Sequence, residues 1–283
     1  LVRRADGSTS WDFGGDDQSA TTTPPRIRAL IVRDGRLRLD DAVRGIELRA
    51  GVASTNRLDA PLAEQLRVDA DGRYNGQPFH LVANGGSLFN LYPVALDVRA
   101  GATHITLDGA VGTAAKDQKL DARLRISGAD MADLYGLLGV VLPNSPPYAL
   151  KARLRREGEA IRVDDLTGNV GDSDLAGDMR FETGGERVHM TADLRSRRLD
   201  FDDLGALVGA PPSTAEGETA SETQKAQARA LASDQRLLPD APLQAERLRA
   251  MDADVRYRAA SVNARAVPFK DVSLDVHLKD GVL

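Results

Sequence analysis

The sequence predicts a mainly β protein, in which a long, twisted antiparallel β-sheet forms a groove or a partly open barrel and carries short helices. Apolar and charged residues alternate along many short segments, and this period of two is that of a strand with one buried face. Glycines and Asp-Gly pairs separate the segments, as tight turns require. Aromatic residues make up only 4% of the 283-residue chain, so Leu, Val, Ile and Ala must build the interior.

The alternation is most regular in LDARLRI at 120–126, in YALKARLRR at 148–156 and in LDVHL at 274–278. Each segment has apolar residues on one face and charged residues on the other. Similar patterns occur at 26–32, 36–40, 65–70, 94–99, 103–108, 187–195 and 254–258. About a dozen strands at this close spacing predict an antiparallel meander, and no βαβ rhythm interrupts it.

Turns are predicted where glycine, alone or after aspartate, allows a tight reversal of the chain. These positions are Asp34-Gly35, Asp71-Gly72, Gly158, Gly171, Gly184-Gly185 and Asp280-Gly281.

Two segments predict short helices, near 130–142 and 201–209, where leucines follow helical spacing after an aspartate. The two segments resemble each other at an offset of 70 residues, which predicts a repeated helix-then-strands unit. Leu231 is the one large aliphatic residue in 211–236, which predicts a polar, flexible linker. The chain thus divides into a repetitive β-sheet region at 1–210, this linker, and a continuation of the sheet region at 237–283.

Composition excludes several classes of function. The 37 basic and 42 acidic residues give a net charge of −5 and are mixed along the chain, so we expect no nucleic-acid binding. The absence of cysteine excludes disulfides, Cys-ligated zinc and thiol catalysis. No apolar run reaches the roughly 18 residues of a membrane helix. We expect the sequence to be part of a longer protein, so a membrane anchor could lie outside it.

The Gly-Asp-Ser segment at 171–173 is similar to the first motif of lipase-type serine hydrolases. A hydrolase nucleophile needs a strand-to-helix turn, a base and an oxyanion donor. Here the residues after Ser173 continue as a strand, and no histidine follows in an Asp-x-x-His setting. We therefore predict a turn, no catalytic residue and a protein that is not an enzyme.

Metal and cofactor sites are not predicted either. His80, His104, His189 and His277 have no partner at metal-ligand spacing and are expected on polar strand faces. The segment 69–72 lacks the acidic positions of a calcium loop. Asp164-Asp165 and Asp202-Asp203 are expected in turns and helix caps. Arg153, Arg155 and Arg156 could contact anionic headgroups, although such faces are more often simply solvated.

The apolar strand faces leave two structures open. The sheet packs on itself as a sandwich or barrel, or it stays an open trough whose apolar side is filled by another molecule. A seven-residue strand spans about 23 Å, which is enough to line a groove for an acyl chain. Physical reasoning alone favours the sandwich.

The segment 142–182 resembles the AsmA family of Gram-negative bacteria through a Leu-Pro-x-x-Pro-Pro-Tyr run and a Gly-Asp-Ser-Asp-Leu-x-Gly turn. The residues of these two motifs are Leu142, Pro143, Pro146, Pro147, Tyr148, Gly171, Asp172, Ser173, Asp174, Leu175 and Gly177. Weaker likeness occurs in SWDF at 10–13 and at Leu199, Asp202, Leu204, Leu238, Pro239, Asp254 and Tyr257.

The resemblance implies a periplasmic protein, anchored in the inner membrane of a Gram-negative bacterium by a segment outside this sequence. Relatives of the TamB type form long β-sheet troughs and are thought to move phospholipid, and AsmA itself is linked to outer-membrane biogenesis. The resemblance therefore favours the open trough over the sandwich.

We predict a non-enzymatic protein that binds or conducts phospholipid acyl chains along the apolar face. The predicted lining residues are Leu120, Leu124, Ile126, Leu150, Leu154, Leu274, Val276 and Leu278, which are equally good core residues. The alternative is a structural scaffold that offers its edge strands to outer-membrane assembly proteins.

Overall fold

The fold is described from a computed structural model of the chain. It describes residues 1–10, 31–43, 45–55, 65–86, 93–111, 120–134, 137, 144–185, 187–201, 203, 225–226, 251–263, 269–280 and 282. The chain forms two compact units. Unit 1 contains Leu1–Gly101 and Asp108–Thr113, and unit 2 contains Ala102–Leu107 and Ala114–Leu283.

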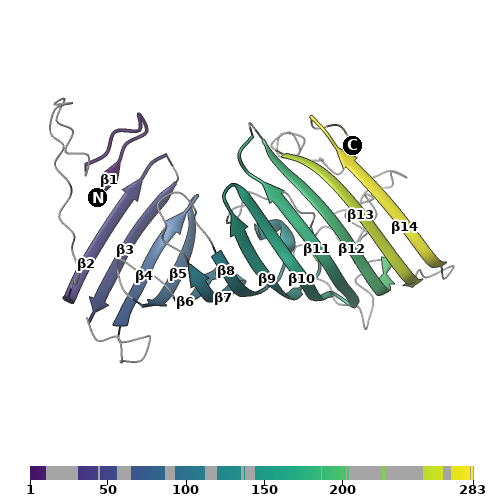
Figure 1. Cartoon of the computed structure of the whole chain (residues 1–283), viewed down its shortest axis with the longest axis horizontal. Helices are drawn as coiled ribbons and strands as arrows, with labels where there is room; N and C mark the ends of the chain where they lie inside the picture. The colour runs from purple at the N-terminus through teal and green to yellow at the C-terminus, as the bar shows by residue number, and fades with distance from the viewer. Residues whose placement is uncertain are drawn as a thin grey trace. The chain divides into compact units, whose positions relative to one another are not determined.

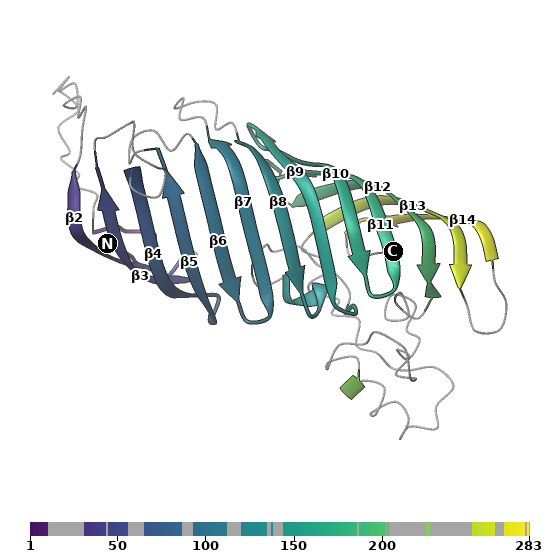
Figure 2. The ribbon, with the colours of Figure 1, turned by 90° about the horizontal axis from the view of Figure 1, so that it is seen from below.

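Strands dominate both units, which confirms the predicted mainly β class (Figures 1 and 2). The strands of unit 1 are β1 Val2–Arg3, β2 Val32–Asp41, β3 Ile46–Ser54, β4 Leu66–Tyr74, β5 Gln77–Gly85 and β6 Val94–Ala100. The strands of unit 2 are β8 Leu120–Gly128, β9 Tyr148–Glu157, β10 Ala160–Val170, β11 Ser173–Glu182, β12 Val188–Asp200, β13 Met251–Asn263 and β14 Phe269–Leu278. Strand β7, Thr103–Val111, is divided between the two units.

Hydrogen-bonded neighbours follow the order of the sequence, from β1 to β14, and the order is open at both ends. Most of the described pairs are antiparallel, as the close spacing of the strands predicts. Two pairs, β1 with β2 and β12 with β13, are parallel and depart from a pure meander. A parallel pair needs a long connection, and residues 201–250 lie between β12 and β13.

The predicted turns at Asp34-Gly35 and Asp71-Gly72 are wrong. Asp34 has a positive φ of 52° inside β2, where the register shifts between Val32 and Gly35, so the pair forms a bulge rather than a reversal. Gly72 lies within β4 opposite Phe79, whose ring approaches the place that a side chain would take. The chain reverses at Asn75-Gly76 instead, where both φ angles are positive, at 49° and 81°.

The remaining described turn positions agree with the sequence. Gly158 and Gly171 have φ angles of 60° and 58° and connect β9 to β10 and β10 to β11. Gly184 and Gly185 lie between β11 and β12. Asp280, at φ 54°, follows β14, and Gly281 lies outside the described residues.

In unit 2, three clusters of buried apolar residues contribute to the core. The largest is built from Ile126, Leu134, Tyr148, Leu150, Ala152, Val163 and Leu166. A second cluster surrounds Met190, Met251, Ala253 and Leu278, and a third joins Leu199, Ala259 and Val262. These clusters are therefore mostly aliphatic, as the low aromatic content predicts, and Tyr148 is the one aromatic residue among their buried members.

The first predicted helix begins with a 3-10 turn η1, Met131–Asp133, and beyond it Leu134 and Leu137 are described and are helical. Asp130 caps it by accepting hydrogen bonds from the Ala132 and Ser145 backbone N–H groups, both at 2.9 Å. Met131 and Leu137 pack against the largest cluster, so the segment covers part of the sheet.

Several predictions fall mainly outside the described residues. They concern most of the strand 26–32, the helix 201–209, the linker 211–236, and the weaker family likeness at Leu204, Leu238 and Pro239. The segment 237–283 contains β13 and β14, which extend the sheet of unit 2.

Candidate functional site

The eight predicted lining residues all lie on one face of unit 2, which we call the apolar face. Cross-strand partners define it, because directly opposed residues in a sheet point to the same side. One row of such partners runs across β8 to β14 through Ala122, Leu154, Val163, Met179, Ala192, Val255 and Val276. Leu120 and Leu124 lie two residues from this row in β8, and Leu274 and Leu278 do so in β14. Ile126 opposes Leu150.

The eight residues differ in exposure. Ile126, Leu150 and Leu278 are buried and belong to the core clusters. Leu120, Leu124, Leu154 and Val276 are partly buried. The side chain of Leu274 is 48% exposed. Three of the eight are thus core residues, while five keep surface that another molecule could cover.

Ser173 occupies a structural position at the β10–β11 turn. Its hydroxyl donates a 2.6 Å hydrogen bond to Asp203 Oδ2 and accepts one of 2.8 Å from the Asp200 backbone N–H. Asp203 Oδ2 also accepts from the backbone N–H groups of Asp172 and Ser173, at 3.0 and 2.9 Å. Neither of these partners of the Ser173 hydroxyl is a histidine.

Burial raises the pKa of Asp203 to about 6, and the charge of Asp200 adds to this. The hydrogen bond from Ser173 and those from the Asp172 and Ser173 amides oppose the shift. Asp200 is itself held by Asn263, whose Nδ2 donates to Asp200 Oδ2 at 2.7 Å. The Gly-Asp-Ser-Asp run thus links the β10–β11 turn to Asp200 at the end of β12, and the hydrogen bond between Asp200 and Asn263 extends the connection to β13.

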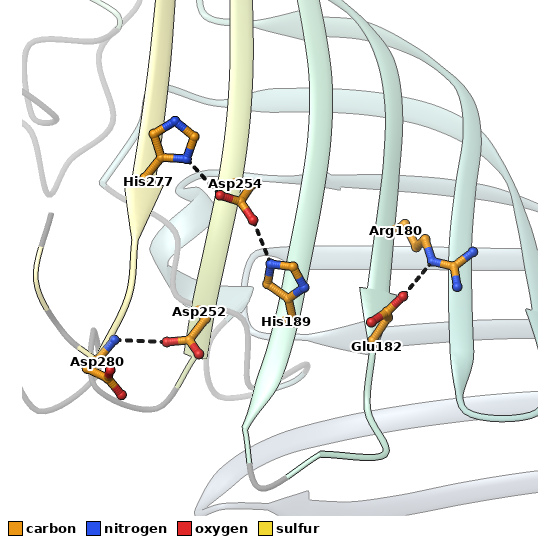
Figure 3. Close-up of polar contacts among 7 residues, drawn as sticks. All are labelled: Arg180, Glu182, His189, Asp252, Asp254, His277 and Asp280. Atoms are coloured by element: carbon orange, nitrogen blue, oxygen red, sulfur yellow. Dashed lines mark hydrogen bonds and ion pairs between the residues drawn. The ribbon is translucent and has the colours of Figure 1, made fainter.

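The opposite, polar face of unit 2 carries cross-strand ion pairs. Arg153 donates from Nε and Nη2 to the two carboxylate oxygens of Asp121, at 2.7 and 2.6 Å. Asp254 lies between two histidines, 2.8 Å from His189 Nε2 and 2.7 Å from His277 Nδ1, and Arg180 pairs with Glu182 at 3.0 Å (Figure 3). Hydrogen bonds from His277 and His189 lower the pKa of Asp254.

Two of the pairs predicted as turns or caps have other roles. Asp164 accepts a 2.6 Å hydrogen bond from Arg155 Nε within the sheet, and Asp165, at φ 52°, forms a bulge in β10. Asp203 ties its carboxylate to the β10–β11 turn, and Asp202 lies outside the described residues.

Two adjoining hollows on the polar face are not predicted from the sequence. The larger, of about 900 Å³, crosses β9 to β14, and its lining includes Lys151, Thr167, Ala176, Arg195 and Arg258. The smaller, of about 680 Å³, is lined by residues from β7 to β10, including His104, Arg125 and again Lys151 and Thr167. The only indication of these hollows in the sequence is that basic residues recur at alternate strand positions. This pattern is equally typical of a solvated face.

Within the described ranges, no group of three or more histidine, aspartate or glutamate residues is arranged to hold a metal ion. The helical segments that the structure describes include none with the length and apolar character to cross a membrane.

Comparisons with known proteins place these features in a family. The model of the AsmA family matches residues 90–283, which is more than half of the chain. The AsmA family protein YhjG of Escherichia coli (strain K12) is 29% identical over 320 residues, covering 100% of this chain and 46% of the relative. The chain thus spans less than half the length of this curated relative. No solved structure matches. The extent of the family match shows that this chain belongs to the AsmA family.

Proposed function

We propose that unit 2 binds phospholipid acyl chains along its apolar face, as a non-enzymatic part of a protein of outer-membrane biogenesis. The main support for the proposal is the continuous row of apolar cross-strand partners across seven strands. On the same face, the side chain of Leu274 is still half exposed. An acyl chain has no polar groups to match, so it is held by burial alone, at about 25 cal/mol per Å² of apolar surface.

The five partly buried or exposed residues supply this contact: Leu120, Leu124, Leu154, Leu274 and Val276. Ile126, Leu150 and Leu278 support them from the core. Among the described residues of β14, one other large apolar side chain is exposed, that of Phe269 at 51%. The strand β14 therefore offers a further apolar contact to a lipid.

The compartment that we propose is the periplasm, with an inner-membrane anchor outside this sequence. Support comes from the membership in the AsmA family and from the length of the relative YhjG, of which this chain covers 46%.

Native mass spectrometry of the purified chain tests the proposal. We expect phospholipid to remain bound to the wild-type chain and to be reduced in Leu274→Asn, because this change places an amide on the exposed part of the apolar face. Asp275→Asn is the matched control, since it puts the same side chain on the opposite face of the same strand. A clean apo mass for the wild type, or equal lipid loss in both variants, contradicts the proposal.

The second candidate function is a scaffold for outer-membrane assembly proteins. It is favoured by the open strand order, since β1 and β14 each have a single hydrogen-bonded neighbour among the described strands. An exposed edge can pair with a strand of another chain. A lipid-free mass together with a bound peptide supports this function instead.

A further inference from the structure

The polar face of unit 2 contains one row of cross-strand partners that has four cations and no acid. The strand registers connect Arg125, Lys151, Thr167, Ala176, Arg195, Arg258 and Ser273 in this order across β8 to β14. We call these seven residues the cationic row. Within it, Arg125 opposes Lys151 and Arg195 opposes Arg258, and like charges in opposed positions destabilise a sheet.

Several neighbouring positions on this face form ion pairs. Arg153 is paired with Asp121, Arg155 with Asp164, and Arg256 with Asp275 at 3.1 Å. In unit 1, the lining of the hollow on β2 to β4 also has both signs, with Arg38, Arg49 and Arg73 beside Asp40, Glu47 and Asp71. The cationic row differs because its own positions include no carboxylate.

Two of the acids that lie near the cationic row are occupied, whereas Asp271, which also lines the larger hollow, has no ion pair or hydrogen bond from its side chain within the described residues. Asp174 accepts from the backbone N–H groups of Arg197 and Arg198, at 3.1 and 2.7 Å, and from Arg197 Nε at 3.3 Å. Asp193 accepts a 2.7 Å hydrogen bond from Arg258. Among the described residues, Lys151 and Arg195 have no ion pair or side-chain hydrogen bond. Both line the larger hollow.

The hollow lies between these two cations because the residues that separate them are small. Thr167 and Ala176 stand between Lys151 and Arg195, three strand spacings apart, or about 14 Å. The bulge at Asp165 shifts the register of β10 beside them and bends the strand. Gly168 allows a close approach to β9, where a methyl group would overlap the Ala149 carbonyl oxygen. The long side chains of Lys151 and Arg195 thus lie on either side of the hollow, and the Thr167 hydroxyl and the Ala176 methyl group lie between them.

We propose that this hollow binds a phosphate group, with Lys151 and Arg195 as its charged ligands, Thr167 as a hydroxyl donor, and Arg125 and Arg258 strengthening the positive potential from either end. Phosphate is the anion that suits this set. It has several acceptor oxygens, which an arginine fork, a lysine ammonium and a hydroxyl can share. The site lies on the face opposite the acyl-binding surface, so it stands independently of the proposed function.

The test compares two double variants that remove equal charge from the same face. Lys151→Gln with Arg195→Gln removes the two proposed ligands. Arg123→Gln with Arg162→Gln removes two exposed cations that line neither described hollow. Inorganic phosphate is titrated at low ionic strength by calorimetry, and vesicles with phosphatidylglycerol are tested by flotation. Circular dichroism checks that each variant folds.

We expect saturable phosphate binding that the Lys151/Arg195 variant weakens about tenfold and the Arg123/Arg162 variant changes less than twofold. Vesicle binding with the same pattern identifies the ligand as a lipid headgroup, whereas phosphate binding without vesicle binding identifies a soluble phosphate compound. Equal weakening by the two double variants, or no saturable binding of either probe, overturns the proposal. Lipid retention through Leu274 is measured separately and does not depend on this outcome.

Discussion

Asp203 is a buried carboxyl group that contacts the turn resembling a hydrolase motif. Its carboxylate accepts three hydrogen bonds from Asp172 and Ser173, yet burial raises its pKa to about 6. The Ser173 hydroxyl is used as a donor to this carboxylate and as an acceptor for Asp200. A motif known from enzymes thus has a structural role here.

The raised pKa of Asp203 predicts how stability changes with pH. Between about 3.8 and about 6 the folded chain keeps a proton on Asp203 that the unfolded chain has lost, so the free energy of unfolding falls as pH rises through this window. The difference of about 2 pKa units corresponds to at most about 3 kcal/mol. We expect the free energy of unfolding to fall less between pH 4 and pH 7 in Asp203→Asn than in the wild type, as measured by urea unfolding at the two pH values.

Part of the fall should remain in Asp203→Asn, because burial also raises the pKa of Asp130. Asp6→Asn is the control, since hydrogen bonds from Ser8 lower the pKa of Asp6 and its effect on stability has the opposite sign. An unchanged fall in Asp203→Asn would show that this carboxyl does not titrate as the structure indicates.

At the scale of elements, the turn β10–β11 depends on Gly171 for two reasons. Its φ of 58° is unfavourable for other residues, and a methyl group there would overlap Asp203 Oδ1 and press on Pro146. Gly158, in the turn β9–β10, has a similar φ of 60°, but no atom lies within 4 Å of the place that a methyl group would take. Substitution of Gly158 therefore tests backbone strain alone, whereas substitution of Gly171 tests backbone strain together with loss of the Asp203 contacts.

We expect Gly158→Ala to lower the free energy of unfolding by about 1 to 2 kcal/mol, the cost of a left-handed residue with a side chain. Gly171→Ala should cost at least about 2 kcal/mol more, because Asp203 must move and release buried N–H groups. Chemical denaturation of both variants measures the difference. Equal losses would mean that the Asp203 contacts add nothing to the turn.

The sequence predicts strand faces better than it predicts strand ends. Strands β8, β9 and β14 follow a strict alternation, and the structure places their apolar residues on one face as expected. Strands β3 and β5 are not among the predicted strands, although Ile46, Leu48, Ala50 and Val52 alternate in β3. The Asp-Gly pairs in β2 and β4 are not turns, because an Asp-Gly pair can also form a bulge, as in β2, or lie inside a regular strand, as in β4. The true reversal, Asn75-Gly76, has the strongest hairpin signal of all.

The candidate sites are only partly predictable. Alternation alone places Leu150 and Leu274 on the same face, but burial depends on neighbouring strands, which leave Leu150 in the core and Leu274 half exposed. The cationic row depends on the register of seven strands and on the bulge at Asp165, neither of which the sequence states. The Asp203–Ser173 contact joins residues 30 positions apart, so it emerges only from the folded arrangement of the strands.

At the scale of the whole molecule, the strand order is open, and we propose a different binding role for each face of the sheet in unit 2. The apolar face of unit 2 offers partly exposed aliphatic residues, while the polar face is held by ion pairs and contains the hollows. We therefore propose that adjacent residues of a strand contact different partners. Both proposals depend on this difference between the faces, because they require the apolar face and the polar face to bind different chemical groups.

Photo-cross-linking from adjacent positions of β14 tests this claim most directly. The photoreactive residue p-benzoylphenylalanine replaces either Leu274, on the apolar face, or Asp275, on the polar face, in the purified chain mixed with phosphatidylethanolamine vesicles. We predict cross-links to the lipid acyl chains from position 274 and at most background from position 275. Equal cross-linking from the two positions, or none from position 274 in a folded chain, would contradict an acyl-binding apolar face.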